Sequence, residues 1–199
     1  MYLLSYVLVI LMQSFIKKLI NPCSLNYKQL QNTIYDPDFE WKYHDPMGFP
    51  GEDRELELPY YSHMILRRPG PGAAYSAITS NLFDLAYGVI EEILNANSIT
   101  LDTLYRININ STFAHKLKKS SWHKDLPFPH TNLIVYLNKF EGGATLVRDN
   151  IEDRYVGTNN YKERWEPKVD DAIIFDGNLE HCHLTPDDGR RITLVVNYL

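Results

Sequence analysis

The chain has 199 residues, enough for one domain with a sizeable hydrophobic core. Its formal net charge of -5 at pH 7 gives no global attraction to nucleic acid, and an aromatic content of 13% argues against disorder. The two cysteines, Cys23 and Cys182, form no disulfide framework, so a reduced, cytoplasmic setting is the simplest expectation.

The chain begins with a hydrophobic extension, which we assign to residues 1–14, ahead of a single domain at 15–199. The run from Met1 to Met12 is apolar except for Ser5, and it is short for a membrane span. It also lacks the basic segment and the cleavage site of a signal peptide. We favour Met12 as the start of translation, with membrane association through residues 1–16 as the alternative, and we expect no stable membrane span.

Residues 15–100 are expected to contain supporting helices. Ser24 is a suitable N-cap for a short helix that ends near Ile34. Apolar and polar residues alternate at 39–43, which indicates a strand, and a second strand is indicated at 60–66.

The clearest helical pattern covers residues 82–94. Apolar residues recur there every three or four positions and form one continuous stripe, after possible capping residues at 79–81. A stripe on a single face indicates that the helix packs against a flat surface, most simply the outer face of a sheet.

The segment 101–199 has a β pattern throughout. Short apolar runs are separated by turns rich in glycine and aspartate, which is typical of a double-sheet barrel or jelly roll. A polar segment at 148–164 lacks a core pattern, and we interpret it as a flap or an edge hairpin. The predicted strands lie at 104–109, 131–138, 144–147, 172–175, 179–184 and 191–199.

A histidine and a carboxylate stand two residues apart at His123 and Asp125, just before the strand at 131–138. Side chains at this spacing in an extended segment point to the same face, so they can bind one metal ion. The pair alone is a weak signal, but the strand at 179–184 offers His181 and His183 as third ligands. Two histidines and one carboxylate form the facial triad of non-haem Fe(II) sites.

Near the end of the chain an arginine and a hydroxyl share one face of the last strand, at Arg191 and Thr193. An arginine fork beside a hydroxyl suits a carboxylate that must be held in one orientation. Arg190 is the alternative arginine, but it lies on the opposite strand face from Thr193.

These residues resemble the catalytic core of the Fe(II)/2-oxoglutarate-dependent dioxygenases, and the prolyl 4-hydroxylase-like branch is the nearest subgroup. The resemblance covers residues 101–198, roughly half the chain. It implies a mainly β fold, a cupin-like double-stranded β-helix with N-terminal supporting α-helices. Residues 15–100 would be the support and 101–199 the catalytic core. Matching context lies at 136–138, 141–145, 175–177 and 191–194, with Pro167 and Asp171.

The resemblance implies that Fe(II) is bound by His123, Asp125 and a distal histidine. Spacing from the turn at 175–177 favours His181, and His183 is the alternative. The co-substrate 2-oxoglutarate would chelate the metal through its 1-carboxylate and 2-keto oxygens. Its far carboxylate would pair with Arg191, with Thr193 and Tyr136 as further donors. O2 is the implied oxidant, and ascorbate is an optional reductant.

The function implied by the resemblance is hydroxylation of a protein side chain such as proline, coupled to conversion of 2-oxoglutarate to succinate and CO2. A protein or peptide is therefore the expected partner. One alternative is a nucleic-acid base oxidase, because lysines cluster at 116–124 beside the motif. Another is a non-catalytic cupin-like binding module that keeps the barrel without turnover.

Overall fold

The structure is a computed structural model that describes residues 14–44, 58–70, 75–148 and 161–199. Most of the hydrophobic extension and most of the predicted flap at 148–164 therefore lie outside the described residues. The helices are α1 (Leu25–Ile34) and α2 (Phe83–Ala96). The strands are β1 (Lys17–Leu19), β2 (Lys42–His44), β3 (Tyr60–Arg67), β4 (Ala77–Ile78), β5 (Leu104–Phe113), β6 (Thr131–Tyr136), β7 (Glu141–Gly142), β8 (Thr145–Arg148), β9 (Glu163–Trp165), β10 (Ala172–Asp176), β11 (Glu180–His183), β12 (Pro186–Asp188) and β13 (Arg190–Tyr198).

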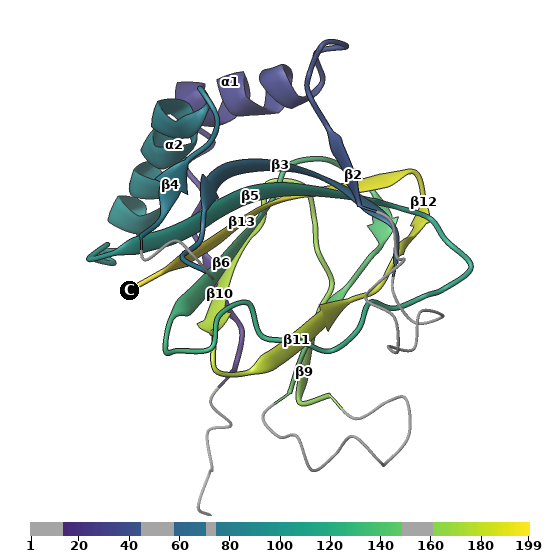
Figure 1. Cartoon of the computed structure of the whole chain (residues 1–199). Coiled ribbons are helices and arrows are strands. Elements are labelled where there is room, and N and C mark those ends of the chain that lie inside the picture. Colours follow the sequence, from purple (N-terminus) through teal and green to yellow (C-terminus); the bar gives the residue numbers. More distant parts are fainter. Residues whose placement is uncertain (1–13, 45–57, 71–74, 149–160) are drawn as a thin grey trace, which may run out of the picture.

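The strands form two layers (Figure 1). The large sheet has the order β1-β10-β6-β13-β5-β3-β2, with β4 paired to β3. The opposing layer contains the sheet β11-β8-β9 and the pair β12-β7. Every pairing among the described strands is antiparallel, and strands distant in the chain are neighbours in each sheet. This arrangement confirms the mainly β fold, a cupin-like double-stranded β-helix.

Both helices cover the outer face of the large sheet (Figure 1). The apolar stripe of α2 is buried there, including Val89, Ile90 and Ile93, as its periodicity predicts. Ser24 caps α1 by accepting a hydrogen bond from the Tyr27 backbone N–H at 3.1 Å. At α2 the N-cap is Leu82 without a side-chain cap, and the Ser80 hydroxyl instead accepts from the Leu82 N–H at 3.1 Å.

On β5 and β13 the two faces of the large sheet differ in chemistry, because side chains alternate along a strand. On β5, Ile107 and Ile109 join the core under the helices. The residues that alternate with them turn inward, and two of these, Arg106 and Asn110, line the interior cavity. β13 repeats this pattern, with its odd-numbered residues from Arg191 onward on the inner face. The helices thus stabilise the outer face of the sheet, while β5 and β13 present polar residues to the cavity and β6 and β10 add a second apolar cluster on the inner face.

The N-terminal region contributes strands as well as helices. β1 pairs with β10 at one edge of the large sheet, and β3 and β2 extend the sheet beyond β5. β1 has two exposed lysines and no apolar alternation, so its pairing depends on the available sheet edge and not on a local pattern. No helix in the described part of the chain is long and apolar enough to span a membrane.

Candidate metal centre

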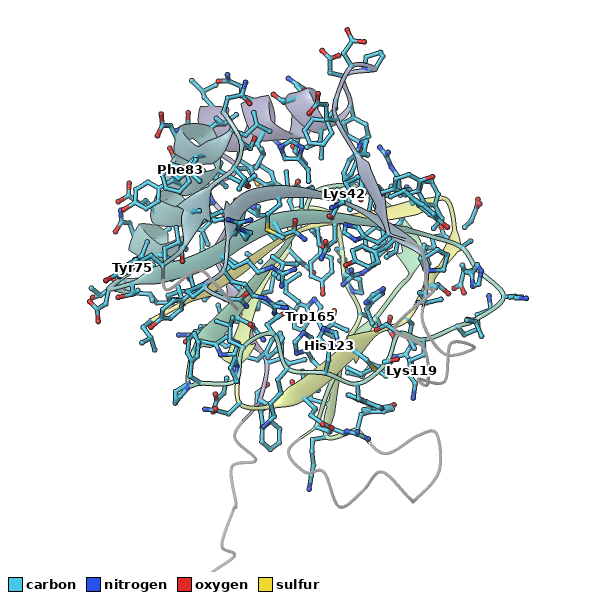
Figure 2. All side chains as sticks on the ribbon, viewed as in Figure 1. Lys42, Tyr75, Phe83, Lys119, His123 and Trp165 are labelled. Atoms are coloured by element: carbon cyan, nitrogen blue, oxygen red, sulfur yellow. The ribbon has the colours of Figure 1, made fainter. Side chains whose placement is uncertain are left out.

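A short bridge between two distant segments brings the candidate histidines together. The His123 backbone N–H donates to the His181 carbonyl at 3.1 Å, and the His181 N–H donates to the His123 carbonyl at 2.9 Å. Residues directly opposed in this way place their side chains on the same face. The two imidazole rings are consequently 4.4 Å apart between centroids, with His123 beside β11 (Figure 2).

Asp125 completes a three-residue donor cluster. One ligand atom each from His123, Asp125 and His181 lies within 4.8 Å of the others. The separation between His181 Nε2 and Asp125 Oδ2 is 3.7 Å. Two imidazoles and one carboxylate are the donor types of a facial Fe(II) site, so the chemistry of this cluster fits a single divalent ion.

The histidines of this cluster are in states that suit metal binding. His123 Nδ1–H donates to the Ser121 carbonyl at 3.0 Å, since a carbonyl can only accept, so Nε2 is the ring nitrogen that remains for a metal ion. Burial lowers the pKa of His181 to about 4, so its ring is neutral at physiological pH. A neutral imidazole is the form that binds a metal.

The Asp125 carboxylate is held at both oxygens. Arg106 Nη1 donates to Oδ1 at 2.8 Å, and Asn197 Nδ2 donates to Oδ2 at 3.0 Å, while Arg68 donates to the Asp125 backbone carbonyl. Burial alone would raise the pKa of Asp125. The charges of His181, when protonated, and of Arg106 outweigh burial, and the pKa lies below its ordinary value. Asp125 is therefore a pre-oriented anion.

Arg191 forms the second charged centre of the cavity. It is buried, and its guanidinium donates to the Gly143 carbonyl at 3.1 Å, to Thr145 Oγ1 at 3.1 Å and to Thr193 Oγ1 at 3.5 Å. Burial lowers the pKa of Arg191, because desolvation disfavours its charge. Within the described residues no carboxylate forms an ion pair with it. A buried cation without an anion is unfavourable, so this site fits a ligand carboxylate.

The neighbouring arginine lies elsewhere. The Arg190 guanidinium carbon lies 5.8 Å from the centroid of the Tyr35 ring and 5.5 Å from that of Trp41. Only Arg191 of the two lines the cavity, as strand alternation from Thr193 predicts.

Tyr136 is fully buried, and its hydroxyl forms a hydrogen bond of 2.8 Å with Thr145 Oγ1. Its ring centroid is 5.3 Å from the Arg191 guanidinium carbon. Thr145 lines the cavity in front of it. Tyr136 therefore contacts the cavity wall through Thr145 and is not itself among the lining residues. Thr145 was expected from the sequence only as part of the matching context at 141–145.

Gly143 holds the backbone of this anion site close to Arg191. Its φ of +67° lies in the region that favours glycine. A Cβ there would meet the Phe140 ring at 2.8 Å and Arg191 Cδ at 3.2 Å. The residue therefore provides both a turn and the space for the arginine stem.

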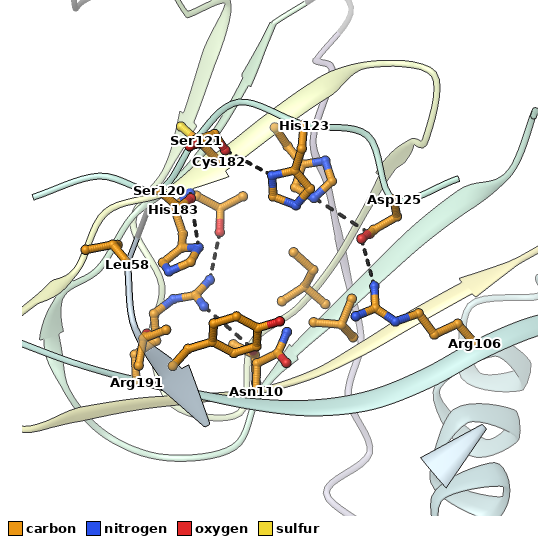
Figure 3. A pocket seen from close by; sticks show the side chains of 17 residues that line it. Leu58, Arg106, Asn110, Ser120, Ser121, His123, Asp125, Cys182, His183 and Arg191 are labelled. Carbon is orange, nitrogen blue, oxygen red and sulfur yellow. Dashed lines mark hydrogen bonds and ion pairs between the residues drawn. The ribbon is translucent and has the colours of Figure 1, made fainter. Parts of the chain in front are cut away.

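One cavity of about 320 Å³ connects the two charged centres (Figure 3). The donor cluster lies at one end, Arg191 with Thr193 lies at the other, and His183 lies between them. His183 lines the cavity but is not part of the cluster of His123, Asp125 and His181. The volume falls in the range of small-ligand sites.

Sequence reasoning missed Arg106, Asn197 and Thr145. Each is an ordinary polar residue at an inward position of a strand, and its contact depends on which strands pair. Alternation along β5 and β13 was the signal that could have found Arg106 and Asn197.

The fold and the donor cluster define a double-stranded β-helix protein with a two-histidine, one-carboxylate site. No family model matches the sequence, and no curated protein matches it. Solved structures do match the fold. A 2OG-Fe(II) oxygenase family oxidoreductase from Burkholderia pseudomallei has 15% identity and a TM-score of 0.57, over 80% of this chain and 71% of that chain.

Two prolyl hydroxylases are also similar. The enzyme from Trichoplax adhaerens, in complex with a peptide fragment of the hypoxia inducible factor oxygen degradation domain, has 12% identity and a TM-score of 0.57. The match covers 93% of this chain and 83% of that chain. The prolyl-4-hydroxylase from Pseudomonas putida has 12% identity and a TM-score of 0.50, over 92% and 91% of the two chains. The chain therefore has the fold of the 2-oxoglutarate/Fe(II) oxygenases, including the prolyl hydroxylases.

Proposed function

We propose that this protein is an Fe(II)- and 2-oxoglutarate-dependent dioxygenase. One observation carries the proposal: a two-histidine, one-carboxylate cluster shares a single cavity with a buried arginine that has no anionic partner among the described residues. A metal ion alone would not need Arg191, and a carboxylate alone would not need the cluster. A metal-chelating acid with a second carboxylate needs both.

In this proposal His123, Asp125 and His181 hold the metal, with Asp125 kept in orientation by Arg106 and Asn197. With these three residues as its ligands, an Fe(II) ion would keep coordination positions for a chelating 2-oxo acid and for O2. When bound, the iron supplies the oxygen chemistry that couples decarboxylation of 2-oxoglutarate to oxidation of a substrate.

The far end of the cavity orients the co-substrate. Arg191 binds its far carboxylate, Thr193 lies beside the guanidinium as a further donor, and Thr145 accepts from Arg191 Nη2. Tyr136 supports this end through its hydrogen bond to Thr145 and its contact with Arg191. Fixing the acid at both ends places its keto group against the metal in one orientation, as productive catalysis requires.

The proposed reaction is hydroxylation of a protein side chain such as proline. Support comes from the fold shared with two prolyl hydroxylases, one of them solved with a bound peptide.

A succinate-release assay tests the proposal. The Fe(II)-loaded protein is incubated with 2-oxoglutarate and O2, alone and with proline-containing peptides or single-stranded oligonucleotides. We expect slow succinate release without substrate and faster release with a peptide. Stimulation by oligonucleotides alone would instead support a base oxidase, and iron binding without succinate would support a binding module.

A pair of arginine variants makes the assay specific to the site. Arg191→Gln removes the buried charge, so the KM for 2-oxoglutarate should rise by about tenfold or more, since a charge-assisted hydrogen bond is lost. Arg190→Gln is the matched control, because Arg190 lies over Tyr35 and Trp41 and does not line the cavity. Equal effects of the two variants would argue against the assigned carboxylate site.

A further inference from the structure

His183 occupies the wall of the cavity between the donor cluster and Arg191 (Figure 3). On β11 it is paired in register with Thr145 of β8, whose hydroxyl oxygen accepts from Arg191 Nη2. His183 Nε2 is buried and has no hydrogen-bond partner among the described residues. A buried polar nitrogen without a partner is unusual in a folded protein and indicates a missing ligand atom.

Ser120 forms a hydrogen bond with Nδ1 of His183, which leaves Nε2 as the ring nitrogen without a partner among the described residues. Ser120 Oγ accepts from the His183 backbone N–H at 3.0 Å, and it lies 3.2 Å from His183 Nδ1. We assign the Ser120 hydroxyl as the donor to Nδ1, and with this assignment the ring proton is on Nε2. The nitrogen without a partner is thus an N–H donor.

We infer that His183 Nε2–H donates a hydrogen bond to the far carboxylate of the acid that Arg191 binds. The inference rests on the proposed function and adds a binding residue to it. The position of His183 across from Thr145 and beside Arg191 places its donor at this end of the cavity. A carboxylate has about four lone-pair directions, so it can accept from Arg191 and from an imidazole together.

This donor should favour 2-oxo acids with a second carboxylate. The imidazole N–H adds a hydrogen bond to the carboxylate that Arg191 binds. An acid without the far carboxylate would leave both Arg191 and His183 unsatisfied.

The test compares two variants of His183 in the Fe(II)-loaded protein under anaerobic conditions, by calorimetric titration with two acids. His183→Leu removes the donor, and His183→Gln keeps an N–H group near the position of Nε2. The acids are 2-oxoglutarate and 2-oxobutanoate, which has the same chelating groups and no far carboxylate. We expect His183→Leu to weaken 2-oxoglutarate binding about tenfold or more, and to leave 2-oxobutanoate binding unchanged. His183→Gln should retain most of the affinity for 2-oxoglutarate.

The other outcomes overturn the inference in different ways. Equal 2-oxoglutarate affinity in His183→Leu and the wild type would remove the proposed hydrogen bond. Equal loss for both acids would place His183 at the chelating end. Loss of iron from His183→Leu, with iron kept by His181→Ala, would make His183 a metal ligand. A wild-type protein that binds iron but neither acid would refute the proposed function itself, and the inference with it.

Discussion

Arg106 and Asp125 form a largely buried ion pair at the metal end of the cavity, and replacing Arg106 with glutamine tests how this end is built. Arg106 Nη1 lies 2.8 Å from Asp125 Oδ1, and the two side chains are 13% and 7% exposed. Removing one partner of a buried pair leaves an uncompensated charge and costs about 3–5 kcal/mol. Because Asn197 still donates to Oδ2, we expect a loss near the lower end, about 3 kcal/mol.

The metal should reverse most of that loss. A divalent cation beside Asp125 supplies the positive charge that Arg106 provided, so the metal-loaded variant should be nearly as stable as the metal-loaded wild type. In the metal-free protein, about 3 kcal/mol corresponds to a fall in Tm of about 6–12 °C for a chain of this length. The increase in Tm on adding metal should therefore be larger in Arg106→Gln than in the wild type.

Thermal unfolding with and without Mn(II) measures both quantities. Arg164→Gln is the matched control, because Arg164 pairs with Glu166 at the surface, where the side chains are 38% and 61% exposed. An exposed pair contributes less than about 1 kcal/mol, so this control should hardly change Tm. An equal fall in Tm with and without metal would refute the reasoning, since it would separate Arg106 from the metal site.

Two further predictions concern pH and the anion site. Burial lowers the pKa of His181 to about 4 in the folded protein, below its ordinary value of about 6.5, so the unfolded chain binds more protons between these values. The stability of the metal-free protein should be complete above about pH 6.5 and should fall as the pH is lowered toward 4, by up to about 1.4 kcal/mol per pH unit from this group. Urea unfolding at pH 7 and pH 5 checks this, and equal stability at both values would contradict it. Separately, Gly143→Ala and Gly189→Ala both place a side chain at positive φ, +67° and +70°. In urea unfolding Gly189→Ala should lose about 1–2 kcal/mol, and Gly143→Ala should lose more, because its Cβ would also meet the Phe140 ring at 2.8 Å. Only Gly143→Ala should also weaken 2-oxoglutarate binding, because its Cβ would lie 3.2 Å from Arg191 Cδ. A Cβ at Gly189 would meet nothing within 4 Å, so Gly189→Ala is the control. Equal binding of 2-oxoglutarate by the two variants would contradict the contact with Arg191.

The sequence allowed much of the fold to be predicted, because burial on one face leaves a periodic pattern. The stripe of α2 and the apolar runs of β6, β10 and β13 are such patterns, and the structure has these elements within a few residues of the predicted positions. β1 left no such pattern: its exposed lysines pair through the backbone with β10. The strand predicted at 39–43 is limited to Lys42–His44, because Phe39 and Trp41 pack on each other, with ring centroids 4.8 Å apart, and on the core.

Some residues of the candidate site could likewise be predicted from the sequence, and others could not. His123 and Asp125 could be predicted from their two-residue spacing in the segment before β6, and Arg191 from its two-residue spacing to Thr193 on β13. Arg106, Asn197 and Thr145 could not, because their contacts depend on the pairing of strands far apart in the chain. The choice between His181 and His183 depends on the bridge to His123, which is a tertiary feature.

The central claim is that His123, Asp125 and His181 hold one iron ion to which 2-oxoglutarate binds. Anaerobic titration of the protein with Fe(II) in the presence of 2-oxoglutarate tests it most directly, because a 2-oxo acid chelated to Fe(II) gives a visible charge-transfer absorption. We predict that the absorption saturates at one iron per chain in the wild type and in His183→Gln, and that it is absent in His181→Ala and Asp125→Ala. Absorption that persists in His181→Ala, or that never develops in the wild type, would contradict the account.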